Sequence, residues 1–468
     1  MSSSSDAARR SDAARRSVAD FATIAGICGM TVLAALLFRH SRLGVFAFVV
    51  DIATWLRGGP MPEVVTWPAW GYAWVVAWLP SFGWIIALQA ALGALALGML
   101  ASRMRKLIPA QGTLIAVLCV FALPWHDLEV TLYPSAPAAS LALLALLSLE
   151  RALAKGSFRW ALAAGILIGL AQNFRTENVL LPAFLGVVLY VLSRFVNLQI
   201  PTLKPMWLFI ATALLMQMPW AQFYHEHAGR YSLTESNFGH VVYVSLGSNL
   251  HNPWGIEAND QAAYKAVKDA GHSFSSLSEE GNKFLLRLAA EKVKEHPSGL
   301  VGRTLQQFRN TLLAPFNWGE PGLGPAGTLH LDVLRQELKS RLGVGVNVLK
   351  LRDFRNRGLI EPAEKDPAAI LALIYQTVMT GIGSLVLAFG IMGIILVLLR
   401  PEVRPATPLL WILGATATYK LLQNALLFYQ INYLNGVFPL FIPFVAVSMT
   451  FIRNTLHRPE GPKLAAPP

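Results

Sequence analysis

Long apolar runs, separated by polar connections, fill most of the chain. Most of these runs are about twenty residues long, the length at which an α-helix crosses a bilayer core of roughly 30 Å. This pattern predicts about ten membrane-spanning helices, at residues 21–38, 82–102, 110–123, 136–153, 160–173, 179–192, 206–224, 369–399, 408–428 and 437–452. The predicted fold class is therefore an all-α polytopic membrane protein.

The composition excludes the soluble alternatives. Of 468 residues, 54% are hydrophobic and only 14% are charged, which is more apolar surface than a soluble protein of this length buries. Both cysteines, Cys28 and Cys119, lie inside apolar runs, so we predict two small core residues rather than a disulfide framework. The net charge of +12 comes from basic residues clustered beside apolar runs, where they orient helices, and no nucleic-acid partner is expected.

The distribution of Lys and Arg predicts the side of the membrane on which each connection lies. Alternate connections are rich in these residues, and because such connections stay in the cytoplasm, both termini are expected inside and a long polar stretch outside. We predict a multi-pass protein of the cell inner membrane with five segments: a cytoplasmic basic tail at 1–20, an N-terminal transmembrane module with outer-face loops at 21–224, an extracytoplasmic domain at 225–366, a C-terminal transmembrane module at 367–456 and a cytoplasmic tail at 457–468.

Capping signals predict that the outer stretch is mostly helical. Asn259 or Asp260 can cap one helix, and Ser276 with Glu279 fits a capping box before the next. An alternating pattern at 241–246 leaves room for a short strand.

The first candidate for chemistry is Asp51, in an apolar segment at 43–57 that is too short to cross the membrane again. This segment is predicted to be a helix lying at the outer interface. A carboxylate in such an apolar setting is costly, which indicates a functional role. The alternative is an ion pair with Arg39 or Arg57 that fixes the first loop.

A second group of polar residues, His126, Asp127 and Glu129, follows the end of a predicted span. Either acid could face Asp51 across one cavity, and the pattern does not choose between them. The alternative is an ordinary solvated loop.

The third group is a tight outer turn that contains Arg175 and Glu177. The planar guanidinium of Arg175 suits a phosphate or a carboxylate ligand, whereas a buried pair with Glu177 would only join the two helices. Lys420 lies inside a predicted span, where it either extends along the helix to an interface or lines a cavity and meets an anionic headgroup.

Four features occur in a telling order. They are Asp51-x-x-x-Trp55-Leu-Arg-Gly58-Gly59, a glycine-rich helix ending in Arg175-Thr-Glu177, a helix broken at His296-Pro297, and an aromatic and proline segment from Tyr429 to Pro443 before the last span. Together they resemble the membrane glycosyltransferases of the GT-C class, especially glycosyltransferase family 39, which is protein O-mannosyltransferase-like, and the aminoarabinose transferases. The resemblance extends over most of the chain.

This resemblance implies a GT-C-like helix bundle and a transferase. Such an enzyme takes a sugar from a polyprenyl-phosphate-linked donor and moves it to a lipid, glycan or protein acceptor on the outer face. The resemblance implies Asp51 as the general base and Asp127 or Glu129 as residues that orient the acceptor or sugar. The donor and its phosphate are expected to meet Arg175, Glu177, Lys420, Tyr433 and His126.

Two departures from the family pattern narrow this expectation. Asp51 is not followed by a second acid, which argues against a bound divalent metal, and no cofactor is expected. The residue before Tyr433 is Asn432 rather than the arginine of many relatives, which removes one phosphate contact.

Two rival functions remain. A lipid or solute transporter would spread its intramembrane charges along a path through the membrane, whereas here they gather at one face. A non-catalytic assembly protein would tolerate the loss of Asp51 and Arg175 together.

Overall fold

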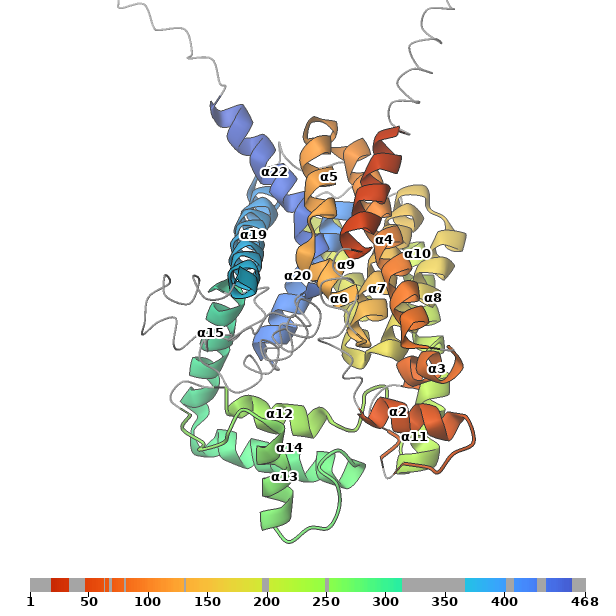
Figure 1. Cartoon of the computed structure of the whole chain (residues 1–468), viewed down its shortest axis with the longest axis vertical. Coiled ribbons are helices and arrows are strands. Elements are labelled where there is room, and N and C mark those ends of the chain that lie inside the picture. The colour runs from red at the N-terminus through yellow and green to blue at the C-terminus, as the bar shows by residue number, and fades with distance from the viewer. Residues whose placement is uncertain are drawn as a thin grey trace, which may run out of the picture.

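The computed structural model describes residues 18–32, 47–62, 64–66, 70–79, 81–129, 132–195, 202–248, 252–313, 367–400, 408–426 and 435–456. Every regular element in these ranges is helical (Figure 1). The all-α prediction is confirmed. The short strand that seemed open at 241–246 is absent, because this segment lies in the helix α12, Phe238–Leu246, whose side chains pack into a core on one side.

Helices form at the positions of all ten predicted spans. They are the first helix Val18–Val32, α4 Phe82–Leu107, α5 Gly112–Val120, α7 Ser135–Lys155, α8 Phe158–Phe174, α9 Leu181–Phe195, α10 Lys204–Leu215 with α11 Met218–Ala228, α19 Pro367–Leu399, α20 Pro408–Leu426 and α22 Phe438–Leu456. Among the described residues, six helical stretches are long and apolar enough to cross a bilayer by themselves. A multi-pass membrane protein is thereby confirmed, while the number of ten spans stays a prediction.

Small residues allow α8 to pack closely on α10. A Cβ atom added at Gly165 would lie 2.5 Å from Cβ of Thr212, and one added at Gly169 would lie 2.4 Å from Cβ of Met216. The two glycines are four residues apart, so they share one face of α8. This Gly-x-x-x-Gly contact is typical of helices that associate inside a membrane.

Two short helices cover the end of the bundle at which α8 ends (Figure 1). Helix α2, Ala47–Leu56, packs on α3, Trp70–Trp78, through an apolar cluster that includes Val49, Ile52 and Tyr72. The helix predicted around Asp51 is therefore present, while its place at the membrane interface stays a prediction. Arg57 joins the two helices, because its guanidinium donates hydrogen bonds to the carbonyl oxygens of Val76 at 2.6 Å and Ala77 at 2.7 Å.

A small helical domain lies beyond the same end of the bundle, beside α2 and α11, whereas α5 lies at the opposite end (Figure 1). It contains α12, α13 Asp260–Asp269 and α14 Glu279–Glu295, which share an apolar core. We call α12 to α14 the outer domain. It continues into α15, Pro297–Leu313, at the predicted break at Pro297.

The capping predictions for this domain are confirmed in one case and wrong in the other. Asn259 caps α13 by accepting a hydrogen bond from the backbone N–H of Ala262 at 3.1 Å. The N-cap of α14 is Ser278, which accepts from the N–H of Gly281 at 3.2 Å, and not Ser276. Ser276 instead hydrogen-bonds His240 of α12, so its hydroxyl joins the turn before α14 to α12.

One buried arginine connects the outer domain to the bundle. Arg303 of α15 donates hydrogen bonds to the carbonyl oxygen of Ser245 at 2.9 Å and to that of Leu426 at 3.0 Å. These carbonyls belong to the last turns of α12 and α20, where the partial negative charge of a helix end favours a cation. The arginine therefore holds the two helix ends together.

Candidate functional site

Three charged side chains, two from one predicted outer turn and one from a distant predicted span, form one cluster at the end of the bundle that faces the outer domain. Glu177 lies on the short 3₁₀ turn η2, Thr176–Asn178, between α8 and α9. Its Oε1 is 2.9 Å from Nζ of Lys420, and its Oε2 is 3.4 Å from Nη2 of Arg175. The side chains are only 11% to 17% exposed. We call these three residues the charge cluster.

The backbone of η2 is also held by α20. Tyr419 donates a hydrogen bond from its hydroxyl to the carbonyl oxygen of Glu177 at 2.9 Å, and Gln423 donates one from its amide to the same oxygen at 3.0 Å. Residue 423 lies one helical turn after both 419 and 420, so its side chain neighbours each of theirs on the surface of α20. The turn is thus fixed by main-chain contacts that do not depend on the Glu177 carboxylate.

Arg175 also contacts an aromatic residue. Its guanidinium lies 5.5 Å from the ring centroid of Tyr133, and Nη1 is 3.4 Å from the Tyr133 hydroxyl. The pair with Glu177 that the sequence left as an alternative is therefore present. It does not exclude ligand binding, because the charge cluster contains two cations and one carboxylate.

A narrow cavity of about 40 Å³ adjoins the charge cluster. Its lining includes Glu177, Asn178, Lys420 and Ser135, together with apolar residues of α7 and α22. Oγ of Ser135 and Oδ1 of Asn178 are buried and have no hydrogen-bond partner among the described residues. Buried polar atoms normally have partners, so this cavity suits a water molecule or a polar ligand group.

Asp51 lies at the same end of the bundle, on the exposed face of α2. Helix α3 connects it to the turn that carries Arg175: Trp70 donates a hydrogen bond from Nε1 to Oδ1 of Asn173 at 3.0 Å, and Gly71 lies against the Asn173 backbone. Asp51 forms no ion pair with Arg57, whose guanidinium points to α3 instead. Arg39, the other expected partner, lies outside the described residues.

The second predicted group lies in a helix, α6 Leu123–Glu129, and not in a solvated loop. His126 is buried, with Nδ1 2.9 Å from the Thr31 hydroxyl and Nε2 2.9 Å from the carbonyl oxygen of Val120. Both ring nitrogens are therefore used in packing α6 against the first helix and the end of α5. This geometry favours a structural role for His126.

Glu129 is completely buried between α4 and α7. Ser140 donates a hydrogen bond to its Oε1 at 2.5 Å, while Oε2 has no partner among the described residues. The carboxyl group rests against Gly93 of α4, where an added Cβ atom would collide with it. The side chain of Asp127 and the whole of Tyr433 lie outside the described residues, so the choice between Asp127 and Glu129 stays open.

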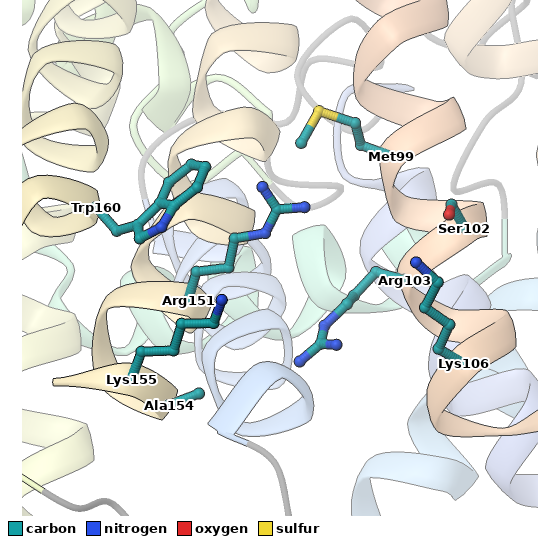
Figure 2. A pocket seen from close by; sticks show the side chains of 8 residues that line it. All are labelled: Met99, Ser102, Arg103, Lys106, Arg151, Ala154, Lys155 and Trp160. Carbon is teal, nitrogen blue, oxygen red and sulfur yellow. The ribbon is translucent and has the colours of Figure 1, made fainter. Parts of the chain in front are cut away.

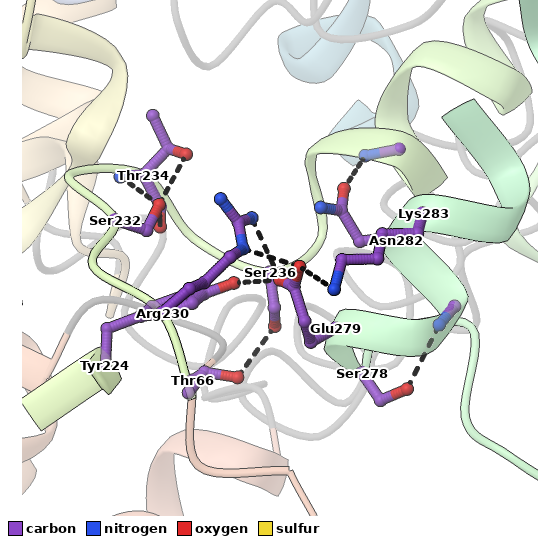
Figure 3. A network of polar contacts seen from close by, with 12 residues as sticks. Thr66, Tyr224, Arg230, Ser232, Thr234, Ser236, Ser278, Glu279, Asn282 and Lys283 are labelled. Carbon is purple, nitrogen blue, oxygen red and sulfur yellow. Dashed lines mark hydrogen bonds and ion pairs between the residues drawn. The ribbon is translucent and has the colours of Figure 1, made fainter. Parts of the chain in front are cut away.

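A polar network holds the outer domain to the bundle (Figure 3). Glu279 accepts hydrogen bonds from the guanidinium of Arg230 at 2.5 and 2.9 Å and from the Tyr224 hydroxyl at 2.5 Å. Burial raises the pKa of Glu279, but the hydrogen bonds from Arg230 and Tyr224 outweigh it and lower the pKa below its usual value. Nearby, Thr66 donates a hydrogen bond to the Ser236 hydroxyl at 3.0 Å and so joins the segment before α3 to the segment that leads into α12.

The sequence missed Tyr133, Tyr419 and Gln423 as neighbours of the charge cluster. The spacing of Tyr419, Lys420 and Gln423 along α20 was a usable signal for two of them. No comparable signal points to Tyr133, because its contact depends on how α7 and α8 pack.

The described residues contain no group of three or more side chains suited to holding a metal ion. The histidines of α11 make other contacts: His225 stacks on Tyr231, and Nδ1 of His227 is 2.8 Å from the carbonyl oxygen of Phe223.

Residues 62–223 match the family model described as dolichyl-phosphate-mannose-protein mannosyltransferase. No curated protein and no solved structure matches the chain. The matched region runs from the segment before α3 into α11 and includes Arg175 and Glu177, whereas Asp51 and Lys420 lie outside it. The predicted resemblance to membrane glycosyltransferases is confirmed over these residues.

Proposed function

We propose that the protein transfers a sugar from a polyprenyl-phosphate-linked donor to an acceptor at the end of the bundle next to the outer domain. The observation that carries this proposal is the charge cluster, two of whose three members lie in the region that matches the mannosyltransferase family. A membrane enzyme that releases a lipid phosphate needs fixed positive charge at the depth of the headgroups. The charge cluster is an arrangement of that kind.

The cations of the charge cluster would stabilise the leaving group. When the bond between the anomeric carbon and the phosphate oxygen breaks, negative charge develops on the departing polyprenyl phosphate. Arg175 and Lys420 are held in place before the reaction by their contacts with Glu177. Such preorganised charges stabilise a transition state without further reorganisation, and removing one typically costs about 10² to 10³ in rate.

Asp51 would act as the general base in this proposal. Its carboxylate takes the proton of an acceptor hydroxyl or amine, the acceptor atom forms a bond to the anomeric carbon, and the electron pair of the broken bond leaves with the phosphate. A positioned base of this type contributes about 10² to 10⁴ in rate. An exposed carboxylate at the edge of the bundle suits this role, because the acceptor must approach from outside the lipid.

Exposed tryptophans support the placement of this end at a membrane surface. Trp74 and Trp78 on α3 and Trp84 at the start of α4 are 41%, 66% and 62% exposed. Tryptophan is enriched where the hydrocarbon core meets the headgroups. On this basis α2 and α3 lie at the interface, where a lipid-linked donor presents its phosphate and sugar. The basic connections at the opposite end of the bundle support a cytoplasmic location for that end, in an inner membrane.

The variant Asp51→Asn tests the proposal. Cell-envelope lipids, polysaccharides and glycoproteins are first compared by mass in cells with and without the protein, which identifies the transferred sugar. The purified wild type and Asp51→Asn are then assayed with the corresponding donor, and we expect a loss of about 10² to 10⁴ in rate for the variant. Asp269→Asn, on α13 of the outer domain, is the matched control and should keep full activity.

Full transfer by a folded Asp51→Asn variant would remove Asp51 as the base. If cells lacking the protein show no missing sugar, and the wild type moves a fluorescent donor lipid across vesicles without forming product, the transporter interpretation replaces the transferase.

A further inference from the structure

A second and larger cavity lies at the end of the bundle opposite the outer domain. Its volume is about 350 Å³, within the range of roughly 300 to 1,000 Å³ that is typical of small-molecule sites. We call it the basic cavity, because four of the eight residues that line it are cations: Arg103, Lys106, Arg151 and Lys155.

These cations come from two helices that face each other across the basic cavity (Figure 2). Helix α4 contributes Arg103 and Lys106 from its last turns, and α7 contributes Arg151 and Lys155 from its own last turns. Spacings of three and four residues place each pair on one helix face. Trp160, near the start of α8, closes the side next to α7.

Of these four cations, Arg103 alone pairs with an acid among the residues that the structure describes. Its guanidinium donates hydrogen bonds to the buried carboxylate of Glu150 at 2.5 and 3.2 Å. Lys106, Arg151 and Lys155 form no ion pair with any residue that the structure describes. Arg151 stacks with its guanidinium carbon 4.7 Å from the Trp160 ring centroid, a contact that orients the guanidinium without neutralising it.

Basic residues at the end of a span have a simpler explanation, which is to orient the helix in the membrane. That role does not require the cations to lie close together, and repulsion between like charges disfavours such a grouping. Here cations from two helices line one cavity beside Trp160. Repulsion of this kind is relieved when an anion lies between the charges.

We propose that the basic cavity binds a phosphate group, carried by an anionic phospholipid headgroup or supplied as inorganic phosphate. Arginine presents a planar fork that matches phosphate oxygens, and lysine adds mobile point charges around it. Tryptophan is enriched where the hydrocarbon core meets the headgroups, so Trp160 in the cavity lining suits contact with the glycerol region of a lipid. The site is separate from the charge cluster, since it lies at the other end of α7 and α8.

The test compares the double variant Arg151→Gln/Lys155→Gln with the wild type, using the full chain. This variant keeps the Arg103–Glu150 pair, so the junction of α4 with α7 is retained. The control is Arg159→Gln/Arg194→Gln, which removes the same charge at the same end but outside the basic cavity. Thermal unfolding of all three proteins checks that each is folded.

The first arm uses nanodiscs of phosphatidylcholine that contain about one tenth phosphatidic acid, and native mass spectrometry counts the phosphatidic acid retained per protein. A cation near a membrane surface contributes about fivefold to the affinity for an anionic lipid, so losing two predicts affinity weaker by about 30-fold. The second arm measures the binding of inorganic phosphate to the protein in neutral detergent by calorimetry.

The proposal is supported if the wild type and the control bind the ligand in either arm and the cavity variant does not. The arm in which this occurs identifies the source of the phosphate. The proposal is overturned if neither ligand binds the wild type, or if the cavity variant and the control weaken binding equally. Equal weakening would show that the cations act only through the overall charge of that surface.

Discussion

Replacing Lys420 by methionine tests the charge cluster directly, because it removes one of two cations around Glu177 and keeps the length of the side chain. At an effective dielectric constant of about 20, opposite charges about 3 Å apart attract by roughly 5 kcal/mol, most of which is offset by desolvation. Taking one partner from a buried pair costs about 3 to 5 kcal/mol when the other charge is left alone. Arg175 stays 3.4 Å from Glu177, so we expect a smaller loss of stability for Lys420→Met, roughly 2 kcal/mol.

The expected effect on transfer is larger than the effect on stability. Lys420→Met changes the charge of the cluster from one net positive charge to zero, and the rate should fall by about 10² to 10³. Lys204→Met is the matched control, since this exposed lysine of α10 lies at the opposite end of the bundle. It should leave both the rate and the stability unchanged.

Glu177→Gln and the double variant Glu177→Gln/Lys420→Met separate the two effects. The single change leaves Arg175 and Lys420 together without their shared carboxylate, so it should also destabilise the protein. The double variant retains one cation and no buried anion. We expect it to be more stable than the sum of the single losses predicts, by at least about 1 kcal/mol. Because Tyr419 and Gln423 bind the backbone of residue 177, the turn itself should stay in place.

The assay is initial-rate transfer from the identified donor, measured beside thermal unfolding in the same detergent. If the cluster acts through its net charge, the double variant regains one net positive charge and should transfer about 10² to 10³ faster than Lys420→Met, close to the wild-type rate. If the double variant and Lys420→Met are equally inactive, Lys420 acts by direct contact with the donor phosphate. A Lys420→Met protein with the rate of the wild type would refute the phosphate role altogether.

Two further predictions concern the scaffold. Glu279→Gln should destabilise the outer domain at neutral pH. The pKa of Glu279 is lowered in the folded state, so the stability that its carboxylate contributes is present above the unfolded pKa of about 4.3 and is lost as the pH falls through the folded pKa. Hydrogen exchange in α14 of the variant should therefore differ from the wild type at pH 7 and converge with it in acid, while Glu280→Gln should match the wild type throughout. Gly165→Ala should push α8 away from α10 and lower the unfolding temperature, whereas Gly381→Ala, which meets no atom within 4 Å, should not; equal unfolding temperatures would contradict the close packing.

The sequence predicted the helices better than it predicted their neighbours. Runs of about twenty apolar residues indicate spans because the bilayer sets their length, and the short helix around Asp51 followed from a run too short to cross. The burial of Glu129 was not predictable, because it depends on α6 packing against α4 and α7. A polar residue beside the end of a span looks the same in sequence whether it faces solvent or another helix.

The charge cluster also depends on contacts between distant segments, yet its members could be identified one by one from the sequence. Glu177 and Lys420 are 243 residues apart, and no local pattern pairs them. Each was singled out because an ionisable side chain at membrane depth is too costly to keep without a partner or a function. The same desolvation penalty applies to every such side chain, so ionisable residues without a partner in different predicted spans or turns are candidates to pair with one another. The two cations and one acid meet in the structure as that reasoning requires, and the same rule draws attention to Glu129, whose second carboxylate oxygen still lacks a partner among the described residues.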